Sequence, residues 1–153
     1  MISKQTHLAE HRIHLRVRYS ETDQMGTFYN SRALEWFECG RTELLRAAGV
    51  PYAEMEARGV LLPLIEAHVE YFGRARYDDL LEMTTRAAFC GKARLRFDVE
   101  IVHAPSEQSR ADCAPAARRI ARGYTVHAIS DAAGKPIRPP DWLLTALPQE
   151  GRA

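Results

Sequence analysis

The chain has 153 residues, of which 46% are hydrophobic and 27% are charged, and its formal net charge is +1 with histidine counted as neutral. These values are typical of one soluble globular domain, so we expect a single domain over residues 1–153 with its core at about 12–143. The near-neutral charge disfavours a nucleic-acid partner, and no apolar run approaches the ~20 residues that a membrane span needs.

The first regular pattern is a strict alternation of apolar and polar residues over residues 12–19. The apolar positions of this segment are Ile13, Leu15, Val17 and Tyr19. A period of two with a charged outer face is typical of a half-buried strand, so we expect these four side chains to share the inner face.

A single long helix is expected after a loop that contains Gly26. Apolar residues recur at helical spacing over residues 31–48. Asn30 or Ser31 is suited to cap the first amides, and Gly49 suits the left-handed position that ends a helix. The pattern therefore predicts an amphipathic helix that begins directly after the loop.

The second half of the chain has the pattern of strands. Pro63 predicts a bulge or an edge position early in the first of them. Cys90-Gly91-Lys92 is a tight connection between two alternating runs, which predicts an antiparallel hairpin. The predicted segments are a short helix at 51–58, strands at 60–72, 81–89, 93–101 and 120–129, a turn at 73–79 and a long exposed loop at 104–118.

This order of elements predicts an α+β fold, in which an antiparallel sheet of about five strands wraps around one long helix. A single helix covers such a sheet only partly, and open sheet edges favour pairing with a second copy. We therefore expect at least a homodimer, with a tetramer as the larger alternative.

Asp23 is the candidate catalytic residue, because it lies in the loop between the first strand and the long helix. The helix start directs unpaired backbone N–H groups and the positive end of its dipole toward that loop. Such an end stabilises a developing oxyanion, and a nearby carboxylate can attack an acyl carbon or deprotonate a water. A plain loop or capping role for Asp23 is the alternative from these residues alone.

Three blocks of sequence resemble the 4-hydroxybenzoyl-CoA thioesterase-like hotdog proteins, and among them the short acyl-CoA thioesterases that include the Tol-Pal-associated enzyme. The blocks occur in the expected order within residues 12–143. They are Tyr19-x-Glu21-Thr22-Asp23-Gln24-Met25-Gly26 followed by Tyr29 and Trp36-Phe37-Glu38-x-Gly40-Arg41-Thr42-Glu43, then Tyr71-x-x-x-Ala75-Arg76-Tyr77-Asp78-Asp79-x-Leu81, and last Arg122-Gly123-Tyr124-Thr125-Val126.

The resemblance implies a hotdog fold and hydrolysis of an acyl-CoA thioester to a free acid and CoA, without a metal or redox cofactor. It assigns the catalytic carboxylate to Asp23, a pocket wall to Tyr19 and a backbone N–H donor to Asn30. Asn30 is a departure, because the family usually has histidine there, and this leaves rate and substrate choice open. Further substrate contacts are expected from Tyr29, Met25, Gly26 and Arg76.

Other residues that carry chemistry have simpler interpretations. Glu38 is expected to pair with Arg41 one helical turn later rather than to catalyse. Arg74, Lys92 and Arg94 are further candidates for the coenzyme A phosphates, although a solvated strand face is the commoner role. Residues 20–48 contain no histidine, which disfavours a hotdog hydratase. A non-catalytic acyl-CoA-binding or scaffold protein is the remaining alternative.

Cysteine usage and the first residues bear on location. Cys39, Cys90 and Cys113 are odd in number and far apart, which favours free thiols over disulfides. The first residues lack the apolar stretch of a signal peptide. Both observations predict a cytoplasmic protein.

Overall fold

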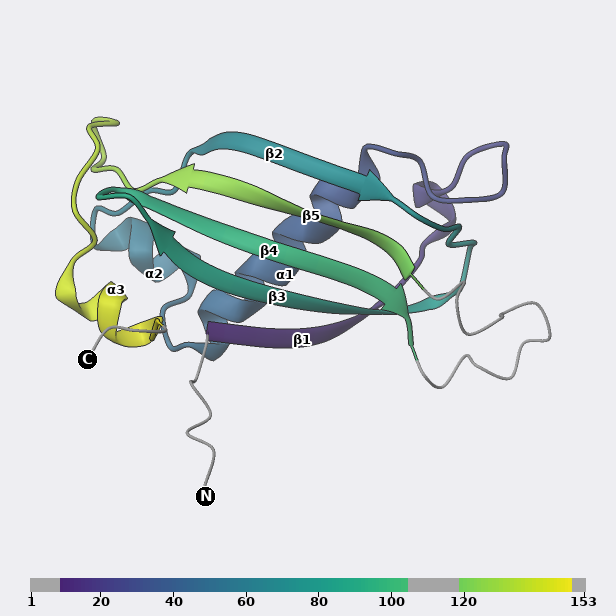
Figure 1. Ribbon diagram of the computed structural model, residues 1–153, viewed down its shortest axis with the longest axis horizontal. Coiled ribbons are helices and arrows are strands. Elements are labelled where there is room, and N and C mark those ends of the chain that lie inside the picture. The colour runs from purple at the N-terminus through teal and green to yellow at the C-terminus, as the bar shows by residue number, and fades with distance from the viewer. Residues whose placement is uncertain (1–8, 105–118, 150–153) are drawn as a thin grey trace, which may run out of the picture.

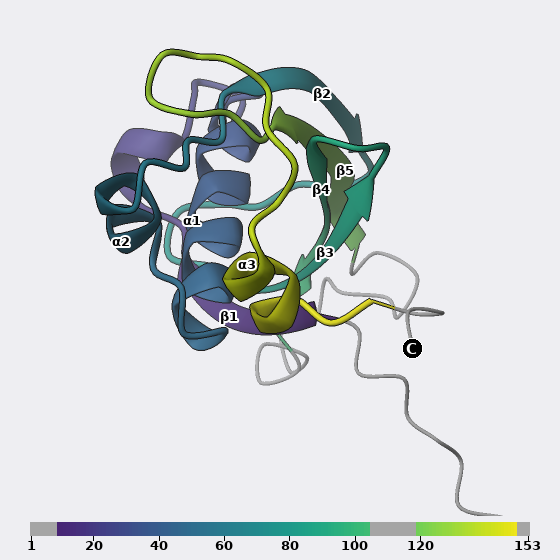
Figure 2. The same cartoon turned by 90° about the vertical axis from the view of Figure 1, so that its left-hand side faces the viewer.

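Five strands form one antiparallel sheet in the computed structural model, which describes residues 9–104 and 119–149. The strand order is β1-β3-β4-β5-β2, and one long helix, α1, lies along one face (Figure 1). Seen end-on, the sheet curves around this helix (Figure 2). The α+β prediction is confirmed. The elements are β1 (Ala9–Arg16), α1 (Arg32–Ala47), α2 (Tyr52–Ala57), β2 (Leu64–Tyr71), β3 (Leu80–Cys90), β4 (Arg94–His103), β5 (Arg119–Ala128) and α3 (Asp141–Ala146).

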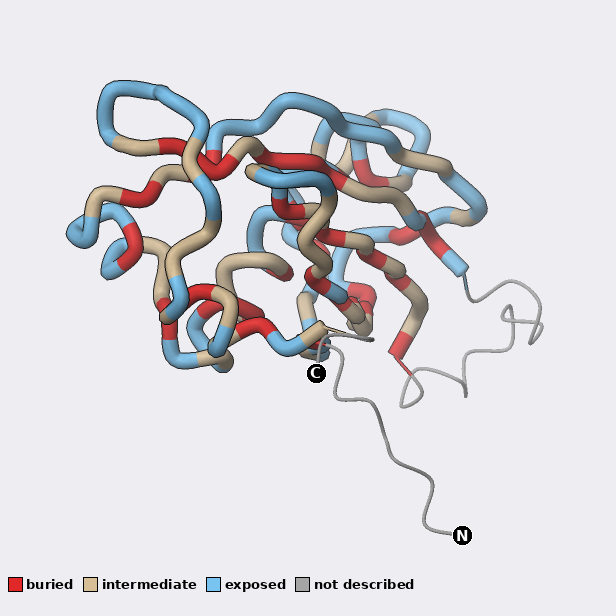
Figure 3. Tube along the Cα trace, turned by 60° about the vertical axis from the view of Figure 1, so that its left-hand side comes forward, coloured by how far each residue is buried: buried red, intermediate tan, exposed pale blue. Residues whose placement is uncertain are grey.

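The core lies between α1 and the central strands. Along β3 and β4, buried residues alternate with half-buried or exposed ones, as their sequence pattern predicts (Figure 3). Gly40 faces Thr85 so closely that a side chain at this position would overlap the Thr85 hydroxyl, which lets the helix approach β3. The helix contributes Ala33, Trp36, Phe37, Gly40, Leu44 and Leu45 to this interface.

The strand β2 lies at one edge of the sheet, and most of its residues are exposed (Figure 3). Its register against β5 shifts between Leu64 and Glu66, so the bulge or edge position predicted from Pro63 is confirmed. The strand begins later than expected, because Pro63 has no N–H to donate and Leu61 instead forms an isolated bridge with Ser130.

The first strand ends earlier than its alternation predicts. β1 stops at Arg16, and Tyr19–Glu21 form a single turn of 3-10 helix. Val17 N donates to Asp79 O at 2.9 Å, which joins the chain to the turn before β3. The placement of Tyr19 on the buried face is therefore wrong, since Tyr19 is 77% exposed.

The ends of α1 lie within one residue of the prediction. Gly49 has a φ of 84°, the left-handed conformation expected of the residue that ends this helix. Capping by a side chain of Asn30 or Ser31 is not observed. Ser31 already has helical backbone angles, whereas a capping side chain normally extends from a β-type residue.

Cys39 and Cys90 are free thiols, as expected. Cys113 and the predicted loop at 104–118, apart from Ala104, lie outside the described residues. In the parts of the chain that the structure describes, no helix combines the length and the apolar character that a membrane crossing requires.

Candidate functional site

Asp23 lies at the start of a tight turn whose backbone is closed by hydrogen bonds. Asp23 N donates to Thr27 O at 3.0 Å, and Gly26 N donates to Asp23 O at 3.0 Å. Gly26 has a φ of 75°, a conformation that glycine adopts without strain. The Asp23 Oδ1 accepts a hydrogen bond from Met25 N at 2.8 Å. The turn therefore orients the carboxylate through one oxygen and leaves the other available.

This turn is fixed to the segment that precedes β3. Phe28 N donates to Ala75 O at 2.8 Å, and Ala75 N donates to the Thr27 hydroxyl at 3.1 Å. The Phe28 ring lies against the rings of Trp36 and Tyr71, with centroid distances of 4.9 and 6.0 Å. The loop between β1 and α1 is thus held by both β2 and the helix, which is the rigidity a catalytic loop needs.

The chain then enters α1 with two backbone amides unpaired. Tyr29 N donates to Glu21 O at 2.8 Å, and Arg32 N donates to Tyr29 O at 2.9 Å. Between them, the amides of Asn30 and Ser31 donate no hydrogen bond to any described residue. Unpaired N–H groups at the positive end of a 16-residue helix suit an anion or a polarised carbonyl oxygen.

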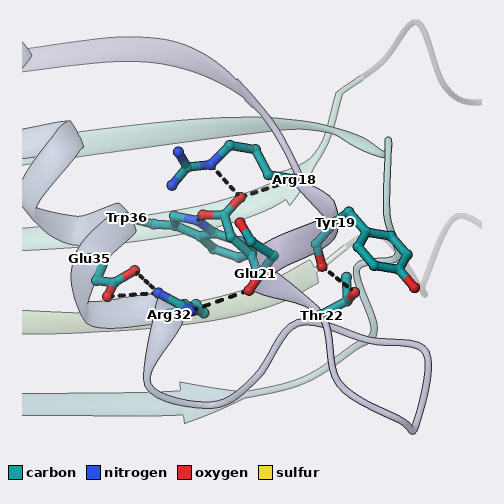
Figure 4. A network of polar contacts seen from close by, with 8 residues as sticks. Arg18, Tyr19, Glu21, Thr22, Arg32, Glu35 and Trp36 are labelled. Atoms are coloured by element: carbon teal, nitrogen blue, oxygen red, sulfur yellow. Dashed lines mark hydrogen bonds and ion pairs between the residues drawn. The ribbon is translucent and has the colours of Figure 1, made fainter.

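A buried carboxylate, Glu21, supports this entry to the helix (Figure 4). Its two oxygens accept hydrogen bonds from Arg18 N at 2.7 Å and from Trp36 Nε1 at 2.6 Å. Burial raises the pKa of Glu21, but the hydrogen bonds from Arg18 and Trp36 and the Arg18 charge outweigh it, so the net pKa lies below its usual value. Glu21 therefore stays ionised near neutral pH.

Glu21 belongs to the first sequence block, but that pattern does not indicate a role for it. Its partner Trp36 lies 15 positions later, a separation at which no sequence pattern reveals a hydrogen bond. Tyr71 likewise belongs to the second sequence block, and its hydroxyl donates to Asn30 O at 2.6 Å across 41 positions. Both residues hold the backbone between β1 and α1.

The other predicted substrate contacts lie on the surface around the turn. Met25 is 67% exposed and Tyr29 is 50% exposed. The Tyr19 ring contacts the edge of the Tyr77 ring, with 5.6 Å between centroids, and points away from Glu21 (Figure 4). Arg76 is exposed, and its backbone N donates to Asp79 Oδ2 at 2.8 Å. The roles predicted for these residues stay predictions.

The expected ion pair between Glu38 and Arg41 is not found, and that prediction is wrong. Arg41 and Glu38 both line a cavity of about 180 Å³, together with Tyr52 and His127. Burial lowers the pKa of Arg41, and the charge of Glu38 opposes this effect. At the start of the same helix, Arg32 forms an ion pair with Glu35 at 2.9 Å.

A second cavity, of about 490 Å³, lies between the β3–β4 hairpin and the segment that leads into α3. Lys92, Arg94 and Arg138 line it, and none of the three forms an ion pair with a described residue. Phe89 and Leu144 provide apolar walls. Within residues 9–104 and 119–149, no group of three or more metal-binding side chains is present, and the expected lack of a metal or cofactor stays a prediction.

A curved antiparallel sheet wrapped around one long helix defines a protein of the hotdog class. Residues 17–147 match the model of the thioesterase-like superfamily, and the chain belongs to this superfamily. A probable thioesterase from Bartonella henselae has a similar structure, with a TM-score of 0.72, 26% identity and coverage of 86% of this chain and 99% of that one.

Two curated relatives are similar in sequence. A putative acyl-CoA thioesterase of Bacillus subtilis, YneP, is 46% identical over 57 residues, which are 37% of this chain and 41% of the relative. The acyl-CoA thioester hydrolase YbgC of Escherichia coli is 33% identical over 90 residues, which are 59% of this chain and 67% of the relative. The chain thus spans less than half the length of YneP and two thirds of that of YbgC.

Proposed function

We propose that this protein hydrolyses an acyl-CoA thioester to a free carboxylic acid and CoA. The observation that carries the proposal is an anchored carboxylate, Asp23, in the loop that leads to the start of α1, where two backbone amides donate to no described residue. Acyl transfer needs a nucleophile or base on one side of the carbonyl and hydrogen-bond donors for its oxygen on the other. Membership of the thioesterase-like superfamily supports the same reaction.

In the proposed reaction the thioester oxygen accepts a hydrogen bond from the amide of Asn30, which polarises the carbonyl carbon. Asp23 then attacks that carbon or takes a proton from an attacking water. When water attacks, the new C–O bond replaces the C–S bond, and the proton that Asp23 took from the water passes to the leaving thiolate. When Asp23 attacks, the C–S bond breaks to give an acyl-Asp23 anhydride, and a water then hydrolyses this anhydride, which releases the free acid, regenerates the carboxylate and supplies the proton for the thiolate. No metal or redox cofactor is required, because a thioester is already an activated acyl group.

The CoA phosphates require cationic partners, and two surface regions offer them. Arg76, the residue favoured by the sequence, is exposed close to the segment that anchors the Asp23 turn. Lys92, Arg94 and Arg138, which form no ion pair with a described residue, line the second cavity beside the β3–β4 hairpin. Guanidinium and ammonium groups both suit phosphate contacts. The cytoplasmic location is part of this proposal and is supported by free Cys39 and Cys90.

Release of free thiol from a panel of acyl-CoA esters with aromatic, short aliphatic and long-chain acyl groups tests the proposal. We expect at least one ester to be hydrolysed with a kcat/KM of about 10⁴ M⁻¹s⁻¹ or more. Binding of the esters without thiol release would instead support the non-catalytic alternative, which Asn30 in place of the usual histidine favours. Absence of both binding and turnover across the panel would contradict both functions.

A homodimer formed through the edge of β2 is also part of the proposal. The outer edge of β2 is open, and the large side chains there are exposed: Leu64 at 52%, Ile65 at 49%, Tyr71 at 49% and Phe72 at 45%. An open edge with exposed apolar side chains suits pairing with the same strand of a partner. Such a dimer extends the sheet and encloses the acyl pocket between subunits.

We expect light scattering after size exclusion to give at least a dimer for the native chain and a monomer for Ile65→Lys, because an ammonium group cannot be buried unpaired at a strand seam. Tyr77→Lys is the control, since Tyr77 is 57% exposed in the turn before β3 and lies away from the β2 edge. A native chain that is monomeric at micromolar concentration would contradict the dimer.

A further inference from the structure

The two peptide groups around Asn30 each accept a hydrogen bond from the turn that opens α1. Arg32 N donates to Tyr29 O at 2.9 Å, and Ala33 N donates weakly to Asn30 O at 3.4 Å. These contacts show that the chain already follows a helical turn at Asn30 and Ser31. The amides of both residues therefore point out of the N-terminal end of the helix, where neither has an acceptor among the described residues.

The short hydrogen bond to this peptide comes from a distant strand. Tyr71, the last residue of β2, donates its hydroxyl proton to Asn30 O at 2.6 Å. Stacking of the Tyr71 ring on Phe28, at 6.0 Å between centroids, directs the hydroxyl toward the start of the helix. Because burial raises the pKa of the Tyr71 hydroxyl, this group keeps the proton that it donates.

A hydrogen bond to a carbonyl oxygen acts on the next amide, because the Asn30 carbonyl and the Ser31 N–H belong to one planar peptide group. The bond fixes the rotation of that plane and polarises its N–H, which makes the N–H a stronger donor. By contrast, the plane that carries the Asn30 N–H is held by Arg32 N through Tyr29 O, which is a local contact of the helix start. The two neighbouring donors are thus oriented by two independent hydrogen bonds.

We propose that Tyr71 is a positioning residue of the thioesterase site, and that it sets the Ser31 amide as a second oxyanion donor beside the Asn30 amide. This inference rests on the proposed function. In it, the thioester oxygen lies between two amides, and Tyr71 acts only through the peptide that it holds. The side chain of Ser31 has no part in the step, in agreement with the lack of any capping hydrogen bond from it.

Tyr71→Phe tests the proposal, because it removes only the hydroxyl and keeps the ring against Phe28. We expect kcat to fall about tenfold while KM changes less than about twofold, since the lost interaction forms mainly with the developing oxyanion. Tyr124→Phe is the matched control. It removes a hydroxyl that donates to Glu66 at 2.9 Å on the sheet face opposite α1. We expect Tyr124→Phe to leave kcat unchanged.

A second readout requires no turnover. In nuclear magnetic resonance spectra without substrate, Tyr71→Phe is expected to move the Ser31 amide resonances, and Tyr124→Phe is expected to leave them in place. An unmoved Ser31 amide, or a kcat within about twofold of the native value, overturns the positioning role. If the native protein hydrolyses no thioester, the proposed function fails, and the Ser31 resonance still decides whether Tyr71 orients this peptide. The two failures are therefore distinguishable.

Discussion

Asp23→Asn is expected to lower thioester turnover by about 10²–10⁴-fold, because an amide can neither attack the acyl carbon nor take a proton from water. Its side-chain oxygen can still accept the hydrogen bond from Met25 N that orients the native carboxylate. The turn, and with it the free energy of unfolding, should therefore be unchanged. The measurement is kcat on the best ester of the panel, with thermal unfolding recorded for the same preparation.

Asp98→Asn is the matched control for this prediction. Asp98 forms an ion pair with Arg96 at 3.0 Å on the sheet face opposite α1. The substitution therefore removes the same negative charge at a position away from the site. We expect its kcat to remain at the native level. Turnover of Asp23→Asn within about tenfold of the native value would remove the central role of Asp23 and leave the helix amides as the only candidate machinery.

Glu21→Gln is expected to lower the free energy of unfolding by about 2 kcal/mol at neutral pH. The glutamine amide has only one acceptor oxygen, so its NH₂ group faces either Arg18 N or Trp36 Nε1 and leaves that buried donor without an acceptor. Denaturant unfolding followed by tryptophan fluorescence measures this loss. Glu35→Gln is the control, since Glu35 forms an exposed ion pair with Arg32, and such pairs contribute about 0–1 kcal/mol.

The same carboxylate predicts a pH dependence. The pKa of Glu21 is lowered on folding, so its ionised form stabilises the native state above its unfolded pKa, near the ordinary 4.5, and this stability is lost as the pH falls through the folded value. The difference in stability between the native chain and Glu21→Gln should therefore be constant above a pH of about 5.5 and shrink below 4.5. A difference that grows on acidification would contradict the assigned ionisation.

Local patterns in the sequence determined the architecture of this protein. Alternation predicted β3, β4 and their hairpin, helical spacing predicted α1 to within one residue at each end, and Pro63 predicted the edge strand β2. The sequence also placed Asp23 in the loop before the helix, as the structure confirms. These features were accessible because side-chain period and turn residues act over a few neighbouring positions.

The tertiary structure alone decided how the candidate site is built. Tyr19 turns outward, although the alternation places it inside, because Val17 bonds to the segment before β3 and ends the strand at Arg16. The hydrogen bonds that hold the entry to α1 join Glu21 to Trp36 and Tyr71 to Asn30. Trp36 lies on α1 and Tyr71 at the end of β2, so these partners come together only in the folded chain. No periodic pattern in the sequence encodes a contact between residues so far apart.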